Sequence, residues 1–189
     1  MKTLNKYIQE KLIINKDYRA AKIVAPKTFD ELRKIIRDRY KKLGPGTKQK
    51  PIDFNDIDIS DIDSFCNKNK GIFERTKFKY IDISDWDVSN VKSTRRMFFG
   101  CEELESIGYI FNWDLSNIHD IYGMFCSCKS FNQDLSDLDV SSVTDMSFMF
   151  YNCESFNQDL SGWDVSKVKF KTNMFDNCPI KEEYKPKFK

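Results

Sequence analysis

The sequence lacks long apolar runs, and this absence limits where the protein can reside. None of its apolar stretches approaches the roughly 18 residues that a membrane-spanning helix needs. Residues 1–16 also lack the continuous apolar region and the small-residue cleavage site of a secretory signal. We therefore expect a cytoplasmic protein whose six cysteines are free thiols rather than disulfides.

The sequence signatures of catalysis are missing as well. The chain has one histidine, His119, and it contains no Gly-rich phosphate loop, nucleophile elbow or paired metal-binding motif. We therefore predict that the protein is not an enzyme and that it uses no cofactor and no metal ion.

What the sequence has instead is an uneven distribution of charge. Residues 1–50 hold 15 Lys and Arg against 5 Asp and Glu, whereas the remaining residues hold 16 against 24. A basic head on an acidic body is typical of contact with an anionic partner such as nucleic acid. It also fits attraction of the head to its own body, and the sequence leaves both interpretations open.

The acidic body consists of repeats. Segments of the pattern WDVSxV…MFxxC begin at Trp86, Trp113, Leu138 and Trp163, so successive starts are 27, 25 and 25 residues apart. The same spacings separate the cysteines that close the segments, which are Cys101, Cys128, Cys153 and Cys178. A degenerate unit near residues 54–85 precedes the four repeats.

A fixed period of this length predicts the fold, because repeats of 20–29 residues are typical of leucine-rich-repeat solenoids. We expect an α/β solenoid over residues 51–178. Each coil should contribute a short parallel strand, as in 160–165, and a short helix, as in 146–153, where apolar residues recur at spacings of three and four. No coil can bury its apolar face alone, so the stack forms the core.

The repeated residues are therefore expected to be structural. Trp, Met-Phe and Cys should form columns of the core, because thiols spread one per coil cannot converge on one zinc ion. The repeats also carry a column of carboxylates, which are Asp87, Asp114, Asp139 and Asp164. Stacked like charges repel, so each Asp should bond nearby backbone or Ser groups; a calcium-binding ladder is the alternative.

At this point the repeats carry a family resemblance. The order FNQ-DLS-x-WDVS-x-V with a later MF, as in "FNQDLSGWDVSKV", resembles the BspA-like leucine-rich repeat, also described as the mycoplasma-type lipoprotein repeat, over residues 54–178. The resemblance implies a repeat protein that binds partner proteins and carries over no catalytic residue. Short members without a signal, with a charged helix before the repeats, resemble phage and gut-bacterial proteins, which implies a bacterial or phage-infected cell, or a virion.

The basic head contains the clearest predicted helix, over residues 28–43. Thr28 and Glu31 form a capping box, and Gly44 with Pro45 ends the helix. We expect this helix to cap the first coil. Its other face carries Arg33, Lys34, Arg37 and Lys41. That basic face is either solvated or contacts nucleic acid, although the chain shows no aromatic stacking platform.

The far end is a charged tail over residues 179–189. We expect it to be too short for a full cap, because it follows Pro179 and holds few apolar residues. The last coil would then leave apolar surface exposed. Such an open end would allow self-association or assembly into a phage particle.

Function is expected at the positions that the repeat leaves free. These variable positions carry aromatic or Arg side chains in each of the four repeats, and they are Arg95, Arg96, Phe99, Tyr122, Phe148, Tyr151 and Phe170. Aromatic and Arg residues are the types that anchor protein interfaces. We therefore predict a non-catalytic protein-binding module with no membrane span. The alternatives are a phage structural or cargo protein and a nucleic-acid contact through the head.

Overall fold

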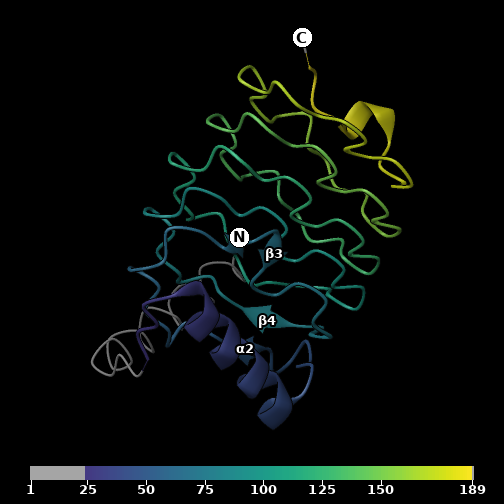
Figure 1. Cartoon of the computed structure of the whole chain (residues 1–189). Helices are drawn as coiled ribbons and strands as arrows, with labels where there is room; N and C mark the ends of the chain where they lie inside the picture. The colour runs from purple at the N-terminus through teal and green to yellow at the C-terminus, as the bar shows by residue number, and fades with distance from the viewer. Residues whose placement is uncertain (1–23, 189) are drawn as a thin grey trace, which may run out of the picture.

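The computed structural model describes residues 24–188, so the first part of the basic head lies outside the described residues. The repeats lie one above another in sequence order (Figure 1). The helix α2 (Phe29–Leu43) lies at one end of this stack, and the single-turn η1 (Glu182–Tyr184) lies at the other.

The helix expected over residues 28–43 is present as α2, with the predicted cap. Thr28 has extended backbone, and its side chain accepts a hydrogen bond from the Glu31 N–H at 3.2 Å. The Glu31 carboxylate accepts from the Lys27 N–H at 2.7 Å, which completes a reciprocal cap one residue further out than a standard capping box. Gly44 ends the helix with a positive φ of 77°, a conformation that glycine adopts without a Cβ penalty.

The helix covers the first units of the stack by apolar and polar contacts. Leu32 and Ile36 are fully buried, and the Tyr40 ring meets the Phe78 ring edge to face at 5.0 Å. The guanidinium of Arg33 donates to the Gly71 carbonyl. The same carbonyl accepts a local bond from the Glu74 N–H at 3.3 Å, so Arg33 adds a second donor at the end of the stack, where no further unit can supply one.

Regular strands are short and are confined to the degenerate unit. β1 (Ile52–Asp53) pairs in parallel with β4 (Ile81–Asp82). β2 (Cys66–Asn67) pairs antiparallel with β3 (Lys70–Gly71), through a turn whose central residues Lys68 and Asn69 both have positive φ. This hairpin is inserted into the unit, which otherwise joins the stack.

One column of parallel bridges runs through all the units. It joins equivalent residues of neighbouring units, in the order Ser64, Ser93, Asp120, Asp145 and Phe170. From Ser93 onward, each such residue begins a segment of consecutive turns, and the segments that begin at Ser93, Asp120 and Asp145 face the same segment of the next repeat. We number the repeats from their Trp or Leu starts: repeat 1 (86–112), repeat 2 (113–137), repeat 3 (138–162) and repeat 4 (163–178).

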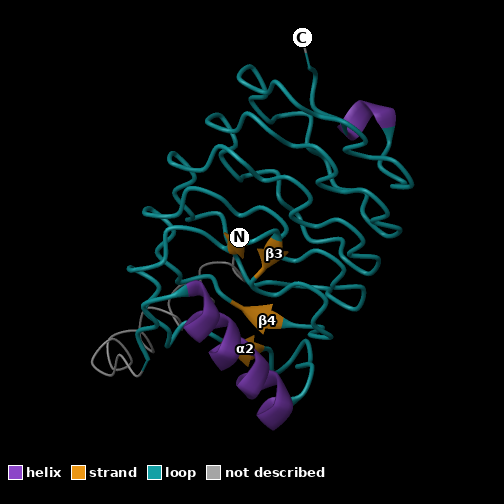
Figure 2. Cartoon of the chain, viewed as in Figure 1, coloured by secondary structure: helices purple, strands orange, loops and turns teal. Residues whose placement is uncertain are grey.

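The short helix predicted in each repeat is replaced by turns, so this part of the prediction is wrong for the described residues (Figure 2). In repeat 3, the Phe148 N–H donates to the Thr172 carbonyl of repeat 4 at 2.8 Å, while the Met149 N–H bonds back to Met146 at 3.2 Å. Successive N–H groups thus donate alternately to a carbonyl of the next repeat and to a carbonyl of a local turn. Phe148 has φ 59°, which an α-helix does not tolerate.

The strand predicted over 160–165 is also absent, because the parallel pairing lies at the bridge column instead.

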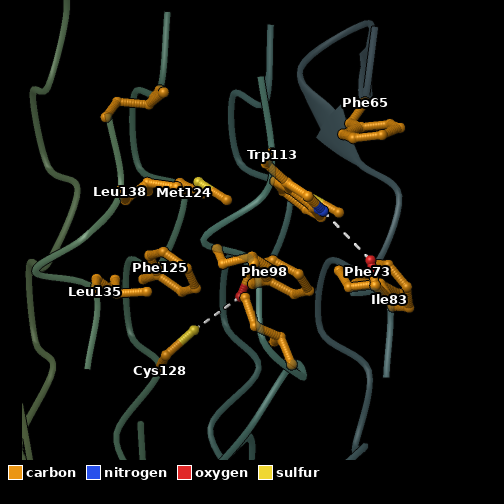
Figure 3. Close-up of a cluster of buried hydrophobic side chains, with 14 of the residues drawn as sticks. Phe65, Phe73, Ile83, Phe98, Trp113, Met124, Phe125, Cys128, Leu135 and Leu138 are labelled. Atoms are coloured by element: carbon orange, nitrogen blue, oxygen red, sulfur yellow. Dashed lines mark hydrogen bonds between the residues drawn. The ribbon is translucent and has the colours of Figure 1, made fainter. Parts of the chain in front are cut away.

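The core consists of side-chain columns, one member per unit. The most continuous column contains phenylalanines whose successive ring centroids lie 5.2, 5.4, 5.8 and 5.7 Å apart, and it comprises Phe73, Phe98, Phe125, Phe150 and Phe175. The rings lie within 21° of parallel. Their regular offset stacking transmits the register from one repeat to the next (Figure 3).

Polar atoms of the core columns bond to the preceding repeat. The Trp113 indole N–H donates to the Ile83 carbonyl at 3.3 Å, and the Cys128 thiol donates to the Phe98 carbonyl at 3.0 Å (Figure 3). Equivalent bonds join Trp163 to Leu135 and Cys153 to Phe125. The repeated Trp and Cys residues are therefore structural, as the sequence predicted.

Candidate functional site

The structure brings six of the seven variable residues together in one surface cluster. We call it the Arg–aromatic cluster, and its members are Arg95, Arg96, Phe99, Tyr122, Phe148 and Tyr151. All six are half-buried. They come from the turn segments of repeats 1, 2 and 3, which the backbone bonds between repeats hold side by side.

A continuous line of side chains crosses the three repeats. The guanidinium of Arg95 lies 3.8 Å from the centroid of the Tyr122 ring. The Tyr122 ring is 5.4 Å from that of Phe148, and Phe148 is 5.7 Å from Tyr151. The first two contacts join neighbouring repeats, and the third lies within repeat 3, although Arg95 and Tyr151 are far apart in sequence. The line is therefore created by the repeat register.

A second pair lies beside this line. The guanidinium of Arg96 lies 3.6 Å from the centroid of the Phe99 ring, and one of its terminal nitrogens contacts Glu74 at 3.0 Å. Gly123 stands at the Arg96 position of repeat 2, and a Cβ placed there would lie 3.7 Å from the Phe99 ring. The absence of a side chain at Gly123 leaves room for the Arg96 and Phe99 side chains to pack against repeat 2.

Backbone strain accompanies the cluster. Arg96 and Phe148 have φ of 55° and 59°, in the left-handed region that costs an ordinary residue about 1–2 kcal/mol. The stack imposes this conformation, because the N–H of each residue bonds to the next repeat, Arg96 to the Tyr122 carbonyl at 2.9 Å and Phe148 to that of Thr172 at 2.8 Å. Arg and Phe are not the residues that this backbone conformation favours, so a role of their side chains must account for them.

The charges of the cluster are balanced and partly accessible. Arg95 pairs with Asp120 at 3.6 Å and its side chain is 31% exposed, whereas the Arg96 side chain is 16% exposed. The Arg96 Nε is buried and has no hydrogen-bond partner within the described residues. Rigid rings and pre-stacked guanidinium groups can form hydrogen bonds and apolar contacts with a protein partner at low entropic cost.

Phe170, the seventh predicted residue, does not join the cluster. It occupies the bridge column of repeat 4, its side chain is 60% exposed, and no ring contact links it to the cluster within the described residues. Its position at the end of the stack gives it a different setting, between two exposed lysines.

Two residues that contact the cluster could not be found from the repeat pattern. Glu74 holds Arg96, and the Asn69 side chain lies 3.5 Å from Arg95 Nε. Asn69 lies in the inserted β2–β3 turn and Glu74 follows it, in a unit whose sequence departs from the repeat. No periodic signal places Asn69, whereas Glu74 follows Phe73 of the Phe column. The Phe73 and Arg75 N–H groups donate to the Met97 and Phe99 carbonyls and so hold Glu74 beside repeat 1.

The predicted basic face of α2 is only partly available for an anionic partner. Arg33 is half-buried, and burial is the main cause that lowers its pKa. Lys34 and Arg37 are exposed, and Lys41 is exposed but lies 3.6 Å from Asp38. The sequence places Arg33 on the basic face but does not predict that its side chain binds the stack through the Gly71 carbonyl.

The groove beside α2 has a volume of about 810 Å³ and lies between the C-terminal half of the helix and residues 45–56. Its charges are largely paired, because Arg39 forms a two-pronged contact with Asp56, at 2.9 Å for one pair of atoms. The groove therefore holds no convergent set of unpaired polar groups that would identify a ligand.

The carboxylate column behaves as the Asp–Ser interpretation predicted. The Ser116 N–H donates to Asp114 Oδ1 at 2.9 Å, and the Ser141 N–H donates to Asp139 Oδ1 at the same distance. Hydrogen bonds from these serines lower the pKa of both carboxyls. Within residues 24–188, no group of three His, Cys, Asp or Glu side chains is arranged to hold a metal ion.

Burial also perturbs the cysteines. It raises the pKa of the Cys101 thiol to about 11 and that of Cys153 further. None of the helices that the structure describes is long and apolar enough to cross a membrane.

Comparison with known proteins gives one match. A family model described as "Mycoplasma protein of unknown function, DUF285" matches residues 55–186. No curated protein and no solved structure matches the chain. The match spans the degenerate unit, the four repeats and most of the tail, but not α2.

Proposed function

The chain belongs to the DUF285 family of mycoplasma-type proteins of unknown function, and from this premise we propose that it is a non-catalytic protein-binding module. Its binding site is the Arg–aromatic cluster. The repeats position the site, and the partner is another protein.

The observation that carries this proposal is the continuous line from Arg95 through Tyr122 and Phe148 to Tyr151. Its contacts of 3.8, 5.4 and 5.7 Å lie on the surface and across three repeats. Core columns explain the repeated Phe, Trp and Cys residues, but no core contact requires this line. Arg and Tyr are enriched among the residues that dominate protein interfaces, which supports a binding function.

We also propose that the stack is a solenoid related to the BspA-like leucine-rich repeats. The column of parallel bridges and the inward Phe column support this classification. In such a solenoid each repeat contacts only its neighbours, so the variable surface residues can change without loss of the core.

The repeats themselves supply the substitutions that test the site. Repeat 4 carries Thr172, Asn173 and Asp176 at the positions of Tyr122, Phe148 and Tyr151. The variant Tyr122→Thr/Phe148→Asn/Tyr151→Asp therefore replaces the line with residues that the same backbone already accommodates. Asn tolerates the left-handed conformation at position 148 better than Phe does.

The experiment uses the full chain as bait in lysate of the source cells, with mass spectrometry, and then calorimetry with the purified captured protein. The matched control is Tyr109→Asp/Phe111→Ser, which replaces exposed aromatics of repeat 1 with their Asp159 and Ser161 equivalents. We expect binding to weaken by at least about tenfold in the triple variant and to remain unchanged in the control. A triple variant that folds and binds every captured protein as the parent does would refute the site.

A further inference from the structure

The turn segments join the repeats through N–H groups that all point in one direction along the stack. In repeat 3, four N–H groups donate to carbonyls of repeat 4 at 2.8–2.9 Å: Met146 to Phe170, Phe148 to Thr172, Phe150 to Met174 and Asn152 to Asp176. Repeats 1 and 2 donate in the same pattern to their own successors. Every second N–H of a turn segment is therefore committed to the next repeat.

Repeat 4 has the same donors, but residues 179–188 do not continue the repeat pattern, so no further repeat is stacked on it within the described residues. Within residues 24–188, no acceptor is found for the N–H groups of Lys171, Asn173, Phe175 and Asn177. These four groups form the edge at which the stack ends. Unpaired backbone donors at such an edge can pair with another chain.

A second change in repeat 4 removes an internal acceptor. In repeats 2 and 3 the bridge residue is an aspartate: Asp120 Oδ1 accepts from the Tyr122 N–H at 2.9 Å, and Asp145 Oδ1 accepts from the Ser147 N–H at 2.8 Å. Repeat 4 has Phe170 at this position, and the N–H of Thr172 has no acceptor within the described residues. The backbone site that binds a carboxylate in two repeats is thus open in repeat 4.

The side chains around the open site favour an anionic occupant. Phe170 is 60% exposed, and both flanking residues, Lys169 and Lys171, are exposed. Lys171 stands where the inner repeats bury an uncharged side chain, as with Ile121 and Met146. A further repeat stacked here would bury the Lys171 ammonium group, which disfavours simple continuation of the stack.

The tail covers the apolar centre of repeat 4 and reaches the edge at one point, where the Lys171 ammonium group lies 4.2 Å from the centroid of the Phe188 ring. The Tyr184 carbonyl accepts from the Leu160 N–H at 2.8 Å, and Lys185 lies over the Phe175 ring at 5.8 Å. The tail is therefore folded against the last repeat, whereas the sequence predicted a tail too short for a full cap. Exposed residues at the edge run from Lys169 to Asn173.

We propose that the edge at residues 169–173 docks an acidic, extended segment of a partner protein. A carboxylate of that segment binds the Thr172 N–H, where repeats 2 and 3 place their own aspartates. Backbone carbonyls of the segment accept from Lys171 and Asn173, and an apolar side chain packs on Phe170. This edge is separate from the Arg–aromatic cluster and does not rest on its function.

The test follows backbone amides of the full chain by NMR. The probe is a blocked peptide in which aspartate alternates with valine, and its neutral counterpart has asparagine in place of aspartate. We expect the acidic peptide to shift the amide signals of residues 171–173, to bind at least about tenfold more tightly than the neutral one, and to weaken as salt is added.

Phe170→Asp provides the decisive variant, because it supplies the missing carboxylate within the chain. We expect it to keep the fold, to occupy the Thr172 N–H and to abolish the peptide-induced shifts. Phe170→Ser is the second variant, since Ser93 occupies this position in repeat 1 and its hydroxyl accepts from the Arg95 N–H at 3.1 Å. Phe111→Asp, which adds the same charge at another exposed Phe, is the control and should bind as the parent does.

Three results would overturn the proposal. The neutral peptide could bind as tightly as the acidic one, or both Phe170 variants could bind the acidic peptide unchanged. Alternatively, sedimentation could show the parent chain dimerising through residues 169–173, with no displacement by the acidic peptide; the occupant would then be a second copy of this chain.

Discussion

At the scale of single residues, three of the four buried cysteines serve as hydrogen-bond donors in the core. The thiols of Cys101, Cys128 and Cys153 each donate to a carbonyl of the preceding unit at 3.0 Å. A thiol in such surroundings is hard to ionise because an anion would lose its hydration. The pKa of Cys101 accordingly rises from 9.0 to about 11.

This burial predicts a graded reactivity of the six thiols. In the folded chain at neutral pH, Cys101, Cys128 and Cys153 should resist alkylation, because only the thiolate reacts. Cys66 and Cys178, which are half-buried, should react faster. Mass spectrometry after iodoacetamide treatment measures each site, and urea should make all six react alike. Rapid labelling of Cys128 without urea would contradict the buried position.

The raised thiol pKa also sets a direction for stability at high pH. The unfolded thiol ionises near 9.0, whereas folded Cys101 keeps its proton up to about pH 11. The contribution of the protonated Cys101 thiol to the free energy of unfolding is therefore fully present below pH 9, and it is lost as the pH rises toward 11.

Residues of the cluster were predictable to different degrees. Tyr122, Phe148 and Tyr151 differ visibly from their counterparts in a repeat alignment, so the sequence singles them out. Glu74 contacts Arg96 because the Phe73 and Arg75 N–H groups bond to repeat 1, in a unit whose sequence departs from the repeat. Phe170 carries the same sequence signal as Tyr122, but it occupies the bridge position of Asp120 and Asp145, two residues before the Tyr122 position, in the last described repeat.

At the scale of elements, α2 is the one segment that local sequence rules determine fully. Its N-cap, its apolar stripe and its terminal glycine all act within a few residues of one another. The turns of the repeats are different, because apolar spacings of three and four fit both a helix and a run of turns. Long-range bonds between repeats, together with left-handed residues such as Asn152 and Asn177, select the turns.

The cap of α2 gives a prediction at this scale. Thr28→Ala removes the acceptor of the Glu31 N–H and should lower the free energy of unfolding by about 1 kcal/mol. Urea unfolding followed by circular dichroism measures the change. Thr172→Ala is the control, because the Thr172 side chain is exposed and has no hydrogen bond within residues 24–188. Equal losses in the two variants would show that the cap contributes nothing.

At the scale of the whole molecule, the small stabilising contributions of single carboxylates add up, because each repeat carries the same Asp–Ser turn. Hydrogen bonds from the following serine lower the carboxyl pKa below 3.8 at Asp87, Asp114, Asp139 and Asp159. Each charged carboxylate therefore stabilises the fold above pH 3.8, and that contribution is lost as pH falls through the lower folded pKa.

We expect the urea midpoint to fall as the pH is lowered from 5 to below 3.8, more steeply than in a variant with fewer Asp–Ser turns. The variant Asp114→Asn/Asp139→Asn keeps an acceptor oxygen but removes two charges, so its midpoint should depend less on pH. Asp137→Asn is the matched control, because Asp137 accepts no hydrogen bond in the described part of the chain. A pH dependence unaltered by the double substitution would contradict this account.

The shared direction of the bonds between repeats gives the whole stack a polarity. In the turn segments every second N–H donates toward repeat 4, whereas the bonds that run the other way lie at the start of each segment, such as those of Lys169 and Phe170 to the Thr144 carbonyl. Aligned peptide units add their dipoles, as they do along a helix. The stack therefore behaves as a macrodipole with its positive pole at repeat 4 and its negative pole under α2, where Arg33 is placed. Because such a dipole acts over only about one turn, we expect it to stabilise an anionic group that is already in contact with the repeat 4 edge.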